Sequence, residues 1–475
     1  MLPNIAPTDS QPVPQPLWLW PTDRTRFKVG VGRCARARYL GYHFDGVGLA
    51  PKAESLPLAT GLYTHQGVEA FGRILAEQDR LPTLEETREI VARVRAAYVA
   101  KVEARGFLGI LGGEQTTETI LEQSALISGL LWALRLKLLP WLHQTYRLLS
   151  VEQERLHFLS CTCGAGPLDA DEHVRRECQG VVLMLRSDLL AQRRGATTLA
   201  YFEVKTTGWE SSAWAEQWEI DPQLGLGTLD VDRLFGAEVA ELYIVGLNKG
   251  PRRREKDEPE GRRKQLSALC YGYRRPGNPP LLAEEWLPSY EWTTDDGETK
   301  RASRAHRRAG VWEIPTGDST TWRAYSSQDP SLSPEEFWVR LLPASVLDKV
   351  CFLLGPMNRQ DQQIASVRRA MLGEEARWQQ VLWDLYALQQ THPWASDAYQ
   401  ARLDTLVPQS WQCRPFGKEH QCAFVPICCR EAGWDDPLAS DRYEARRPHH
   451  VLEADQWRAR GIVVDGTGSA EGDEA

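Results

Sequence analysis

A series of short apolar runs between residues 148 and 247 constrains the fold more than any other feature of the chain. Val181–Leu190, Thr198–Lys205 and Glu241–Leu247 are largely apolar, and Leu148–Leu159 partly alternates between apolar and polar residues. Runs of this length between turn residues are typical of core strands. A short helix is predicted around Leu229–Phe235, before the last strand. The chain should therefore build a central sheet here.

Segments with helical periodicity lie on both sides of these strands. The clearest helix start is Thr83, which should cap its helix while Glu86 completes a capping box. Helical patterns cover residues 64–78, 83–105, 114–148 and 334–403, and residues 31–45 indicate a short helix or loop. Helices combined with core strands predict an α/β fold, with helices flanking the central sheet.

Composition divides the chain into consecutive segments. We expect a disordered Pro-rich leader (1–25), an N-terminal helical region (26–147), a core (148–250), a basic inserted loop or hairpin region (251–330), a second helical region that ends in a cysteine cluster (331–462) and a disordered acidic tail (463–475). The catalytic residues are expected in the core segment, because that segment holds the predicted strands.

Composition also limits the class of protein. Hydrophobic residues make up 42% of the 475 residues and charged residues 25%, which suits a soluble protein with a sizeable core. The longest apolar block, Leu126–Leu142, is interrupted by Arg135 and Lys137, so no membrane span is expected. The start lacks a signal-peptide pattern, which predicts a cytoplasmic protein. Ten cysteines in that compartment suggest metal ligands rather than disulfides. The net charge of -8 argues against a passive DNA-coating protein, but an enzyme needs only a local basic groove.

Asp188, Glu203 and Lys205 form the strongest candidate catalytic group. Glu203 and Lys205 are two residues apart on a predicted strand, so their side chains share one face while Val204 packs into the sheet. If the strand with Asp188 pairs beside it in a hairpin, two carboxylates and an ammonium group converge. Such a group can hold Mg²⁺ or Mn²⁺, activate water and offset charge on a phosphate. The alternative is a charged pair on a solvated face, but the surrounding run is apolar, where unused charge is costly.

Three stretches, GVVLMLRSDLL, AYFEVKTTG and WEIDPQLGLG, resemble the RecB-type branch of the PD-(D/E)XK nuclease superfamily. The resemblance implies a restriction-endonuclease-like nuclease core, with a mixed central sheet flanked by helices, over residues 148–250. It implies catalytic roles for Asp188, Glu203, Lys205 and Gln223. Members of the branch usually have Tyr four residues after this Gln, where the chain has Gly227.

An upstream stretch, GLYTHQGVEAF, resembles the His motif of the same branch, with Gly61 and His65. Taken alone, His65 would more often be a surface residue at a helix start. Glu152 and Glu154 match a less constant acidic position, and either could equally face solvent. As a whole, the resemblance implies Mg²⁺ or Mn²⁺ with ligands at His65, Asp188, Glu203 and Val204.

One early and three late cysteines, namely Cys34, Cys413, Cys422 and Cys428, resemble the iron–sulfur nucleases of this branch. These include the AddB-type recombination nucleases and the CRISPR-adaptation exonucleases. The resemblance implies a [4Fe–4S] cluster that joins the helical N- and C-terminal parts of the chain. The gap between Cys413 and Cys422 is longer than is common in that group. A zinc site, or buried thiols without metal, are the alternatives.

Other residues suggest a second metal site and a DNA surface. Cys351 and Cys270 lie in apolar surroundings and are expected in the core. Arg33, Arg36 and Arg38, beside Cys34, are the preferred DNA contacts over the basic runs of residues 252–264 and 300–308. Cys161, Cys163, His173 and Cys178 could form a structural zinc site. The alternative is that this segment is an ordinary loop without metal.

The resemblance implies a metal-dependent DNA exonuclease in recombination, repair, phage DNA processing or CRISPR adaptation. A structure-specific endonuclease on the same core and a non-catalytic DNA-binding scaffold subunit are the alternatives. DNA, as single strands or ends, is the expected partner. The chain has no Walker A pattern for a built-in helicase motor, and the identity of any helicase or recombination partner is left open.

Overall fold

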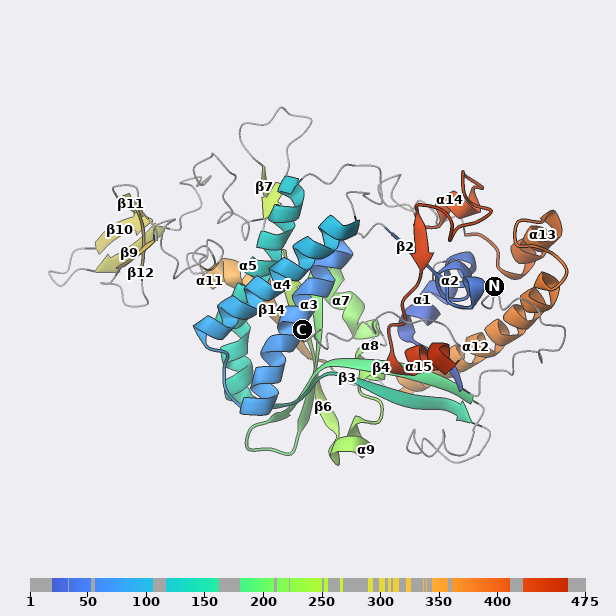
Figure 1. The fold of residues 1–475 in the computed structure, drawn as a ribbon. Helices are drawn as coiled ribbons and strands as arrows, with labels where there is room; N and C mark the ends of the chain where they lie inside the picture. Colours follow the sequence, from blue (N-terminus) through green and yellow to red (C-terminus); the bar gives the residue numbers. More distant parts are fainter. Residues whose placement is uncertain are drawn as a thin grey trace.

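A six-stranded mixed sheet lies at the centre of the structure, with helices on both faces (Figure 1). The computed structural model describes residues 19–32, 34–52, 56–105, 117–161, 180–208, 212–221, 223–249, 336, 339, 344–357, 361–410 and 422–459, with short strands between 252 and 325. The sheet contains β1 (Leu19–Thr22), β3 (Tyr146–Cys161), β4 (Gly180–Arg193), β5 (Leu199–Thr207), β6 (Val239–Asn248) and β14 (Cys351–Met357). The β1–β4 and β5–β6 pairs are parallel, and the other pairs are antiparallel. An α/β fold with a mixed central sheet is confirmed.

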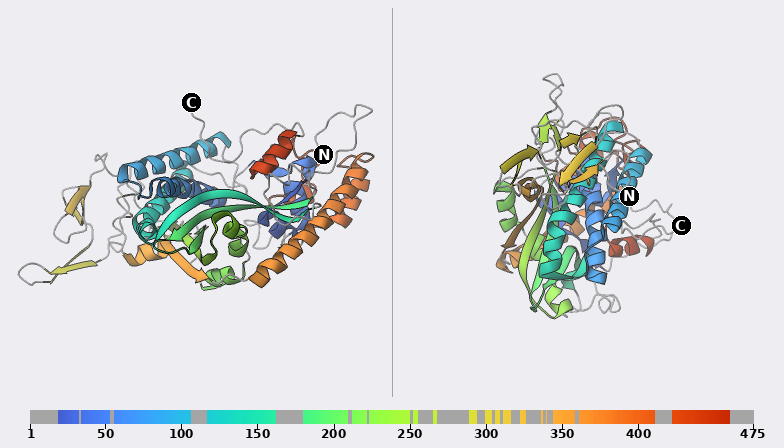
Figure 2. Two further views of the ribbon diagram at one scale, coloured as in Figure 1. Left: turned by 90° about the horizontal axis from the view of Figure 1, so that it is seen from below. Right: turned by 90° about the vertical axis from the view of Figure 1, so that its left-hand side faces the viewer.

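Alternating side chains along β5 account for the two helical layers. Phe202 and Val204 pack in one core with α3 (Leu56–Gln78), α4 (Leu84–Arg105) and α5 (Thr117–Thr145). Leu199 and Tyr201 face a second core, with α7 (Ser212–Ile220), α8 (Gln223–Gly227) and α9 (Val231–Phe235). Figure 2 shows the two layers on opposite sides of the long β3–β4 ribbon. Because strand residues alternate, Glu203 shares the face of Tyr201.

Helix α4 begins as the sequence predicts. The Glu86 N–H donates a hydrogen bond to the Thr83 hydroxyl at 3.1 Å, and the Thr83 N–H donates one to the Glu86 carboxylate at 2.7 Å. This reciprocal pair is a capping box, which satisfies N–H groups that a helix start leaves without partners.

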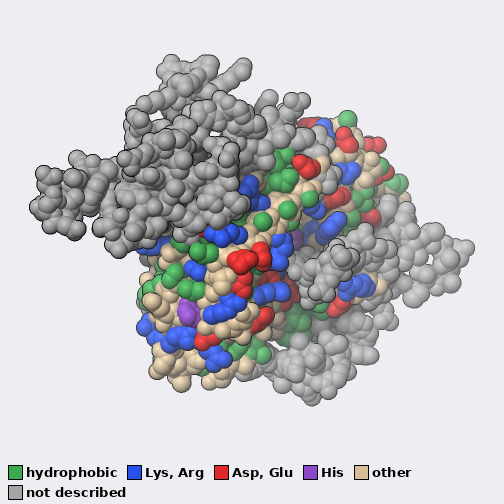
Figure 3. Space-filling view, turned by 60° about the vertical axis from the view of Figure 1, so that its left-hand side comes forward, with side chains coloured by type: hydrophobic (Ala, Val, Ile, Leu, Met, Phe, Trp, Pro, Cys, Tyr) green, Lys and Arg blue, Asp and Glu red, His purple; other side chains and the backbone are tan. Residues whose placement is uncertain are grey.

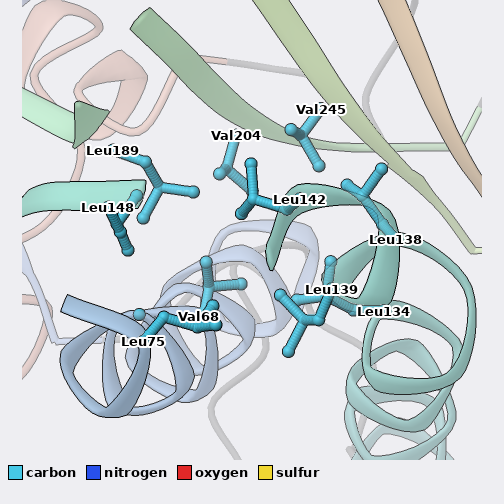
Figure 4. A pocket seen from close by; sticks show the side chains of 11 residues that line it. Val68, Leu75, Leu134, Leu138, Leu139, Leu142, Leu148, Leu189, Val204 and Val245 are labelled. Carbon is cyan, nitrogen blue, oxygen red and sulfur yellow. The ribbon is translucent and has the colours of Figure 1, made fainter. Parts of the chain in front are cut away.

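Helix α5 is the most apolar helix of the core. Over Gln123–Thr145 it is long and apolar enough to cross a membrane, but 72% of its apolar window is buried inside the protein. It packs on the sheet beside α3, around a cavity of about 10 Å³ lined by apolar side chains that include Leu189 and Val204 (Figure 4). A space of this size holds about one water molecule at most. The backs of the strands that carry Asp188 and Glu203 are therefore apolar.

Helices from the two ends of the described chain pack together beside the sheet (Figure 1). The early elements are α1 (Arg24–Gly32), α2 (Ala35–Tyr42), the 3-10 turn η1 (Phe44–Gly46) and β2 (Leu49–Pro51). The late elements are α12 (Asp361–Gln389), α13 (Asp397–Leu406), α14 (Val425–Cys428), β15 (Tyr443–Ala445) and α15 (Val451–Ala459). β2 pairs with β15, and buried side chains including Tyr39, Trp378 and Trp394 form a common core. Apolar packing and strand pairing therefore hold the two ends together.

Two expectations about the chain's organisation need correction. Residues 19–25 fall in the predicted disordered leader, but they form β1 and the start of α1, because β1 pairs with β4. The predicted helical region 334–403 contains the strand β14, whose apolar residues pair with β6 at the edge of the sheet. Residues 1–18 and the predicted acidic tail, 463–475, lie outside the described residues.

Short antiparallel strands occur in the predicted basic insertion, residues 251–330. They form small sheets separate from the central one, and in Figure 1 β9 to β12 lie well away from it. They are β7 (Arg252–Arg254), β8 (Gln265–Ser267), β9 (Ser289–Thr293), β10 (Thr299–Ser303), β11 (His306–Arg308), β12 (Val311–Pro315) and β13 (Trp322–Tyr325). Helix α11 (Ala344–Val350) then leads directly into β14.

Candidate active site and metal centre

The candidate site lies at a gap in the central sheet. β3 pairs with β4 along one edge from end to end. The opposite edge of β4 is shared, because β1 pairs with Gly180–Leu183 and β5 pairs with Leu189–Gln192. Between these stretches, neither of the two described strands pairs with β4. Side chains from the end of β1, from β4 and from β5 can therefore meet in the gap.

Asp188 stands where β4 and β5 separate. The regular pairing of these strands reaches Leu189 and Phe202. At the next position, the Asp188 carboxylate accepts a hydrogen bond from the Val204 N–H at 2.6 Å, as a main-chain carbonyl would in a continued ladder. The hairpin that the sequence predicts between the Asp188 strand and the Glu203 strand is therefore present, and it opens at the two carboxylates.

The Glu203 carboxylate is buried, and several side chains hold it. Lys205 and Gln223 donate hydrogen bonds to Oε1, and Tyr201 donates one to Oε2. Arg24, the first residue of α1, brings Nη1 to 3.9 Å from Oε1. Gln223 reaches this carboxylate from the first turn of α8, so the predicted catalytic residues of β5 and α8 are in direct contact.

Tyr201 accounts for the glycine at position 227, where the resembling family usually has Tyr. A Cβ atom at Gly227 would lie 2.6 Å from the ring and hydroxyl of Tyr201, which leaves no room for a side chain. Burial raises the pKa of Tyr201 well above its ordinary value, and the charge of Glu203 adds to the effect. The hydroxyl therefore keeps its proton and donates a hydrogen bond to Glu203. Tyr201 of β5 therefore occupies the space beside Gly227 of α8.

His65, Glu152 and Asp188 form a group that could hold a metal ion, since their ligand atoms lie within 4.8 Å of one another. His65 extends from α3 and brings Nδ1 to 3.5 Å from Glu152 Oε1. Gly61 lets α3 approach the sheet, because a Cβ there would lie only 3.1 Å from the Thr206 hydroxyl. Two carboxylates and one imidazole suit Mn²⁺. They also suit Mg²⁺, which takes fewer of its ligands from the protein.

The structure separates the two acidic residues that the sequence left equivalent. Glu152 lies in the site and has a φ of 48°, in the left-handed region that residues other than glycine rarely adopt. Glu154 points elsewhere, accepting a hydrogen bond from the Val451 N–H at 3.0 Å and lying 3.4 Å from His450. Glu152, which also pairs with Arg186 at 2.7 Å, is therefore the acidic residue that lies with His65 and Asp188, and Glu154 ties β3 to the start of α15.

Burial and neighbouring charges shift the pKa values of the site residues. Burial raises the pKa of Asp188 to about 7, and the charge of Glu203 adds to the rise. Burial also acts to raise the pKa of Glu203, but the surrounding donors, Lys205 first, outweigh it and lower the value. Burial acts to lower the pKa of His65, yet the hydrogen bond with Glu152 and the charge of Asp188 raise it. Near neutral pH, Glu203 is ionised while Asp188 can still carry a proton.

The predicted site residues lie close together, but not all of them point their side chains into the site. Val204 packs its side chain in the core, so only its main-chain carbonyl could contact a metal. Tyr201 was not predicted, although the alternation Tyr-x-Glu-x-Lys on one strand puts it on the face of Glu203 and Lys205. Arg24 was also missed, and no local pattern could have indicated it, because β1 and the gap in the sheet bring it to the site.

Arg36 and Arg38 do not form the exposed DNA-binding group that the sequence suggested. Arg36 is 2% exposed, pairs with Asp404 at 2.6 Å and donates to a main-chain carbonyl. Arg38 is fully buried, pairs with Glu375 and lies over the Trp378 ring. Both guanidinium groups join α2 to the C-terminal helices, so they are unavailable to phosphates. The third residue of the predicted group, Arg33, lies outside the described residues.

The cysteines proposed for an iron–sulfur cluster come from both ends of the chain. Cys34 Sγ accepts a hydrogen bond from the Ser410 N–H at 3.4 Å, and the neighbouring Gln409 side chain donates to the Cys428 carbonyl at 3.2 Å. Cys422 and Cys428 both lie close enough to Tyr443 to affect the pKa of its hydroxyl, which burial chiefly raises. Among the described residues these thiols do not form a complete ligand group, and Cys413 lies outside them.

The predicted zinc residues fall mostly outside the described chain. Cys161 ends β3 and pairs with Gly180, the first residue of β4. Cys163, His173 and Cys178 lie outside the described residues. Cys351 is buried in the core, as predicted, whereas Cys270 lies outside the described residues.

No protein-family model matches the chain, and no curated protein matches its sequence. The chemistry of the site itself therefore carries the functional argument.

Proposed function

We propose that this chain is a metal-dependent DNA exonuclease of the RecB-type branch of the PD-(D/E)XK superfamily. The observation that carries the proposal is the convergence of His65, Glu152, Asp188, Glu203 and Lys205 around the point where β4 and β5 separate. Buried carboxylates are costly without a cation or a hydrogen-bonding role. An ion-binding, phosphate-cleaving site explains why so many of them gather there.

The donor set fits a divalent metal ion. His65, Glu152 and Asp188 would hold Mn²⁺ or Mg²⁺, with Glu203 and the Val204 carbonyl as further candidates. Bound there, the ion would acidify a water molecule and stabilise negative charge on the phosphate. The raised pKa of Asp188 supports this assignment. It means that, without a metal ion, the positive groups around Asp188 are too few to stabilise its negative charge.

The side chains on β5 and α8 would support the hydrolysis. The reaction breaks one P–O bond of the DNA backbone and forms another to the oxygen of water. Lys205, 24% exposed and adjacent to Glu203, can orient that water and offset charge that grows on the phosphate. Tyr201 and Gln223 fix the Glu203 carboxylate through hydrogen bonds, so its orientation is set before substrate arrives.

A [4Fe–4S] cluster is part of the proposal, with Cys34, Cys413, Cys422 and Cys428 as ligands. The common contact of Cys34 and Cys428 with residues 409–410, just before Cys413, supports this set. Absorbance near roughly 400 nm that Cys34→Ser abolishes would favour the cluster over zinc. We place the protein in the cytoplasm, where thiols remain available as ligands.

Cleavage of end-labelled linear and circular DNA, single- and double-stranded, tests the proposed function. We expect Mn²⁺- or Mg²⁺-dependent loss of linear DNA that Glu203→Ala and Lys205→Ala abolish. The matched control is Arg402→Gln, an exposed residue of α13 paired with Asp384 at 3.0 Å. Cleavage of circles would indicate an endonuclease instead. Binding of DNA without cleavage of any substrate would favour the scaffold subunit and refute the proposal.

A further inference from the structure

Two cations on α1 line the edge of the candidate site. Arg24 is 28% exposed and lies 3.9 Å from Glu203 Oε1. Lys28, one helical turn later, is 51% exposed and lies 2.6 Å from Asp221 Oδ2. Asp221 in turn accepts a hydrogen bond from the Gln223 N–H at 2.9 Å. Because residues four apart on a helix share a face, α1 presents both cations to the gap between β1 and β5.

The opposite face of α1 is anchored in the protein. Arg26 is 4% exposed and pairs with Glu453 of α15 and, at 3.0 Å, with Asp23. Phe27 packs against the apolar cluster that includes Leu183 of β4. This anchoring fixes the position of the helix, so Arg24 and Lys28 reach the site without a loop having to close.

The Arg24 guanidinium has unused hydrogen-bonding capacity. Within the described part of the chain it makes no hydrogen bond, and its single ion pair, with Glu203, is a long one. A guanidinium group carries five N–H donors in a fork that matches phosphate oxygens. A metal ion at the carboxylates would repel this cation and weaken its attraction to Glu203, which leaves it available to an anion at the same place.

The negative net charge of the chain means that DNA would have to be bound by a local group of cations. The net charge is -8, and on the face drawn in Figure 3 basic and acidic side chains are interspersed among the described residues. With the predicted arginines of α2 buried, α1 offers exposed cations directly beside the proposed catalytic group. We infer that Arg24 and Lys28 form a subsite for backbone phosphates of the DNA strand next to the phosphate that is cut. This inference rests on the proposed nuclease function.

The salt dependence of DNA binding tests the subsite. Each phosphate contact with a single strand adds about 0.7 to the slope of log K against log salt concentration. Fluorescence anisotropy of a labelled single-stranded oligonucleotide with Ca²⁺ should therefore give a slope lower by about 1.4 for Arg24→Gln/Lys28→Gln. The control Arg402→Gln should keep the wild-type slope, and a gel should show that the oligonucleotide stays intact.

The outcomes separate this inference from the proposed function. If the wild type binds and cleaves DNA but the double variant keeps its slope, the subsite is refuted and the nuclease stands. If the wild type neither binds nor cleaves DNA, both proposals fail. Circular dichroism checks that the variants fold. The single variant Lys28→Gln should still lower the slope by about 0.7. Its side chain is half exposed and pairs with Asp221, so the change leaves the carboxylates of the sheet untouched.

Discussion

Replacing Asp188 by Asn should stabilise the metal-free protein at alkaline pH. Burial and the charge of Glu203 raise the pKa of this carboxyl from 3.8 to about 7, so its ionised form is unfavourable in the fold. Asn has almost the same shape, carries no charge, and its side-chain oxygen can still accept the hydrogen bond from the Val204 N–H. The substitution therefore removes the buried charge and keeps the local structure.

The size and sign of the effect follow from the shift. The pKa of Asp188 is higher in the folded state than in the unfolded state. Such a group contributes its full stability at pH values below its unfolded pKa, near 4, and that contribution is lost as the pH rises through the folded pKa, about 7. A shift of about three units corresponds to about 4 kcal/mol once the group is ionised in both states. We take this as an upper limit, so Asp188→Asn should raise the free energy of unfolding by up to about 4 kcal/mol at pH 8.5 and by little near pH 4.

Urea unfolding in EDTA at several pH values measures this difference. The matched control is Asp384→Asn, at an exposed pair with Arg402, where we expect a change within about 0.5 kcal/mol at every pH. A variant that is less stable than the wild type at pH 8.5, or whose difference from it does not change with pH, would refute the reasoning. In that case Asp188 would be a structural partner in the sheet and not a charge held for a cation.

Further predictions address the site and the helical ends. Saturating Mn²⁺ should stabilise the wild type, by about 2.7 kcal/mol at a hundred times Kd, and should leave the melting temperature of Asp188→Asn almost unchanged. Gly227→Ala should lower stability by about 1–3 kcal/mol in urea unfolding, because its Cβ would overlap the Tyr201 ring; an unchanged midpoint would show that the ring moves freely. Glu375→Gln should lower the free energy of unfolding by about 3–5 kcal/mol, because it leaves the buried charge of Arg38 unpaired; a loss under 1 kcal/mol would contradict the ion pair.

Local rules were enough for much of the fold. The apolar runs predicted β4, β5 and β6, because a strand buried on both faces needs apolar side chains on both, and partial alternation predicted β3. The Thr83–Glu86 pair predicted the start of α4, since a capping box involves only residues three apart. The two-residue period of a strand predicted that Glu203 and Lys205 share a face, and they are in contact.

Contacts between distant parts of the chain decided the rest. β1 and β14 were missed because short strands are stabilised by the neighbours with which they pair, and their own residues give a weak signal. Arg38 looked like a surface cation because the sequence does not show that Glu375 is buried opposite it. Glu152 and Glu154 looked equivalent until α3 brought His65 to one and α15 brought His450 to the other.

The sequence by itself determined which side chains a strand or helix presents on each face, because the geometry of one element fixes that pattern. Only the tertiary structure decided that β1 and β5 share one edge of β4 and leave a gap between them. Arg24 and Gln223 reach Glu203 at that gap, and α3 brings His65 close to Glu152 and Asp188. The physical reason is that a site of this kind depends on which elements pack together, and the free energy of that packing comes from apolar contacts spread over the whole sheet.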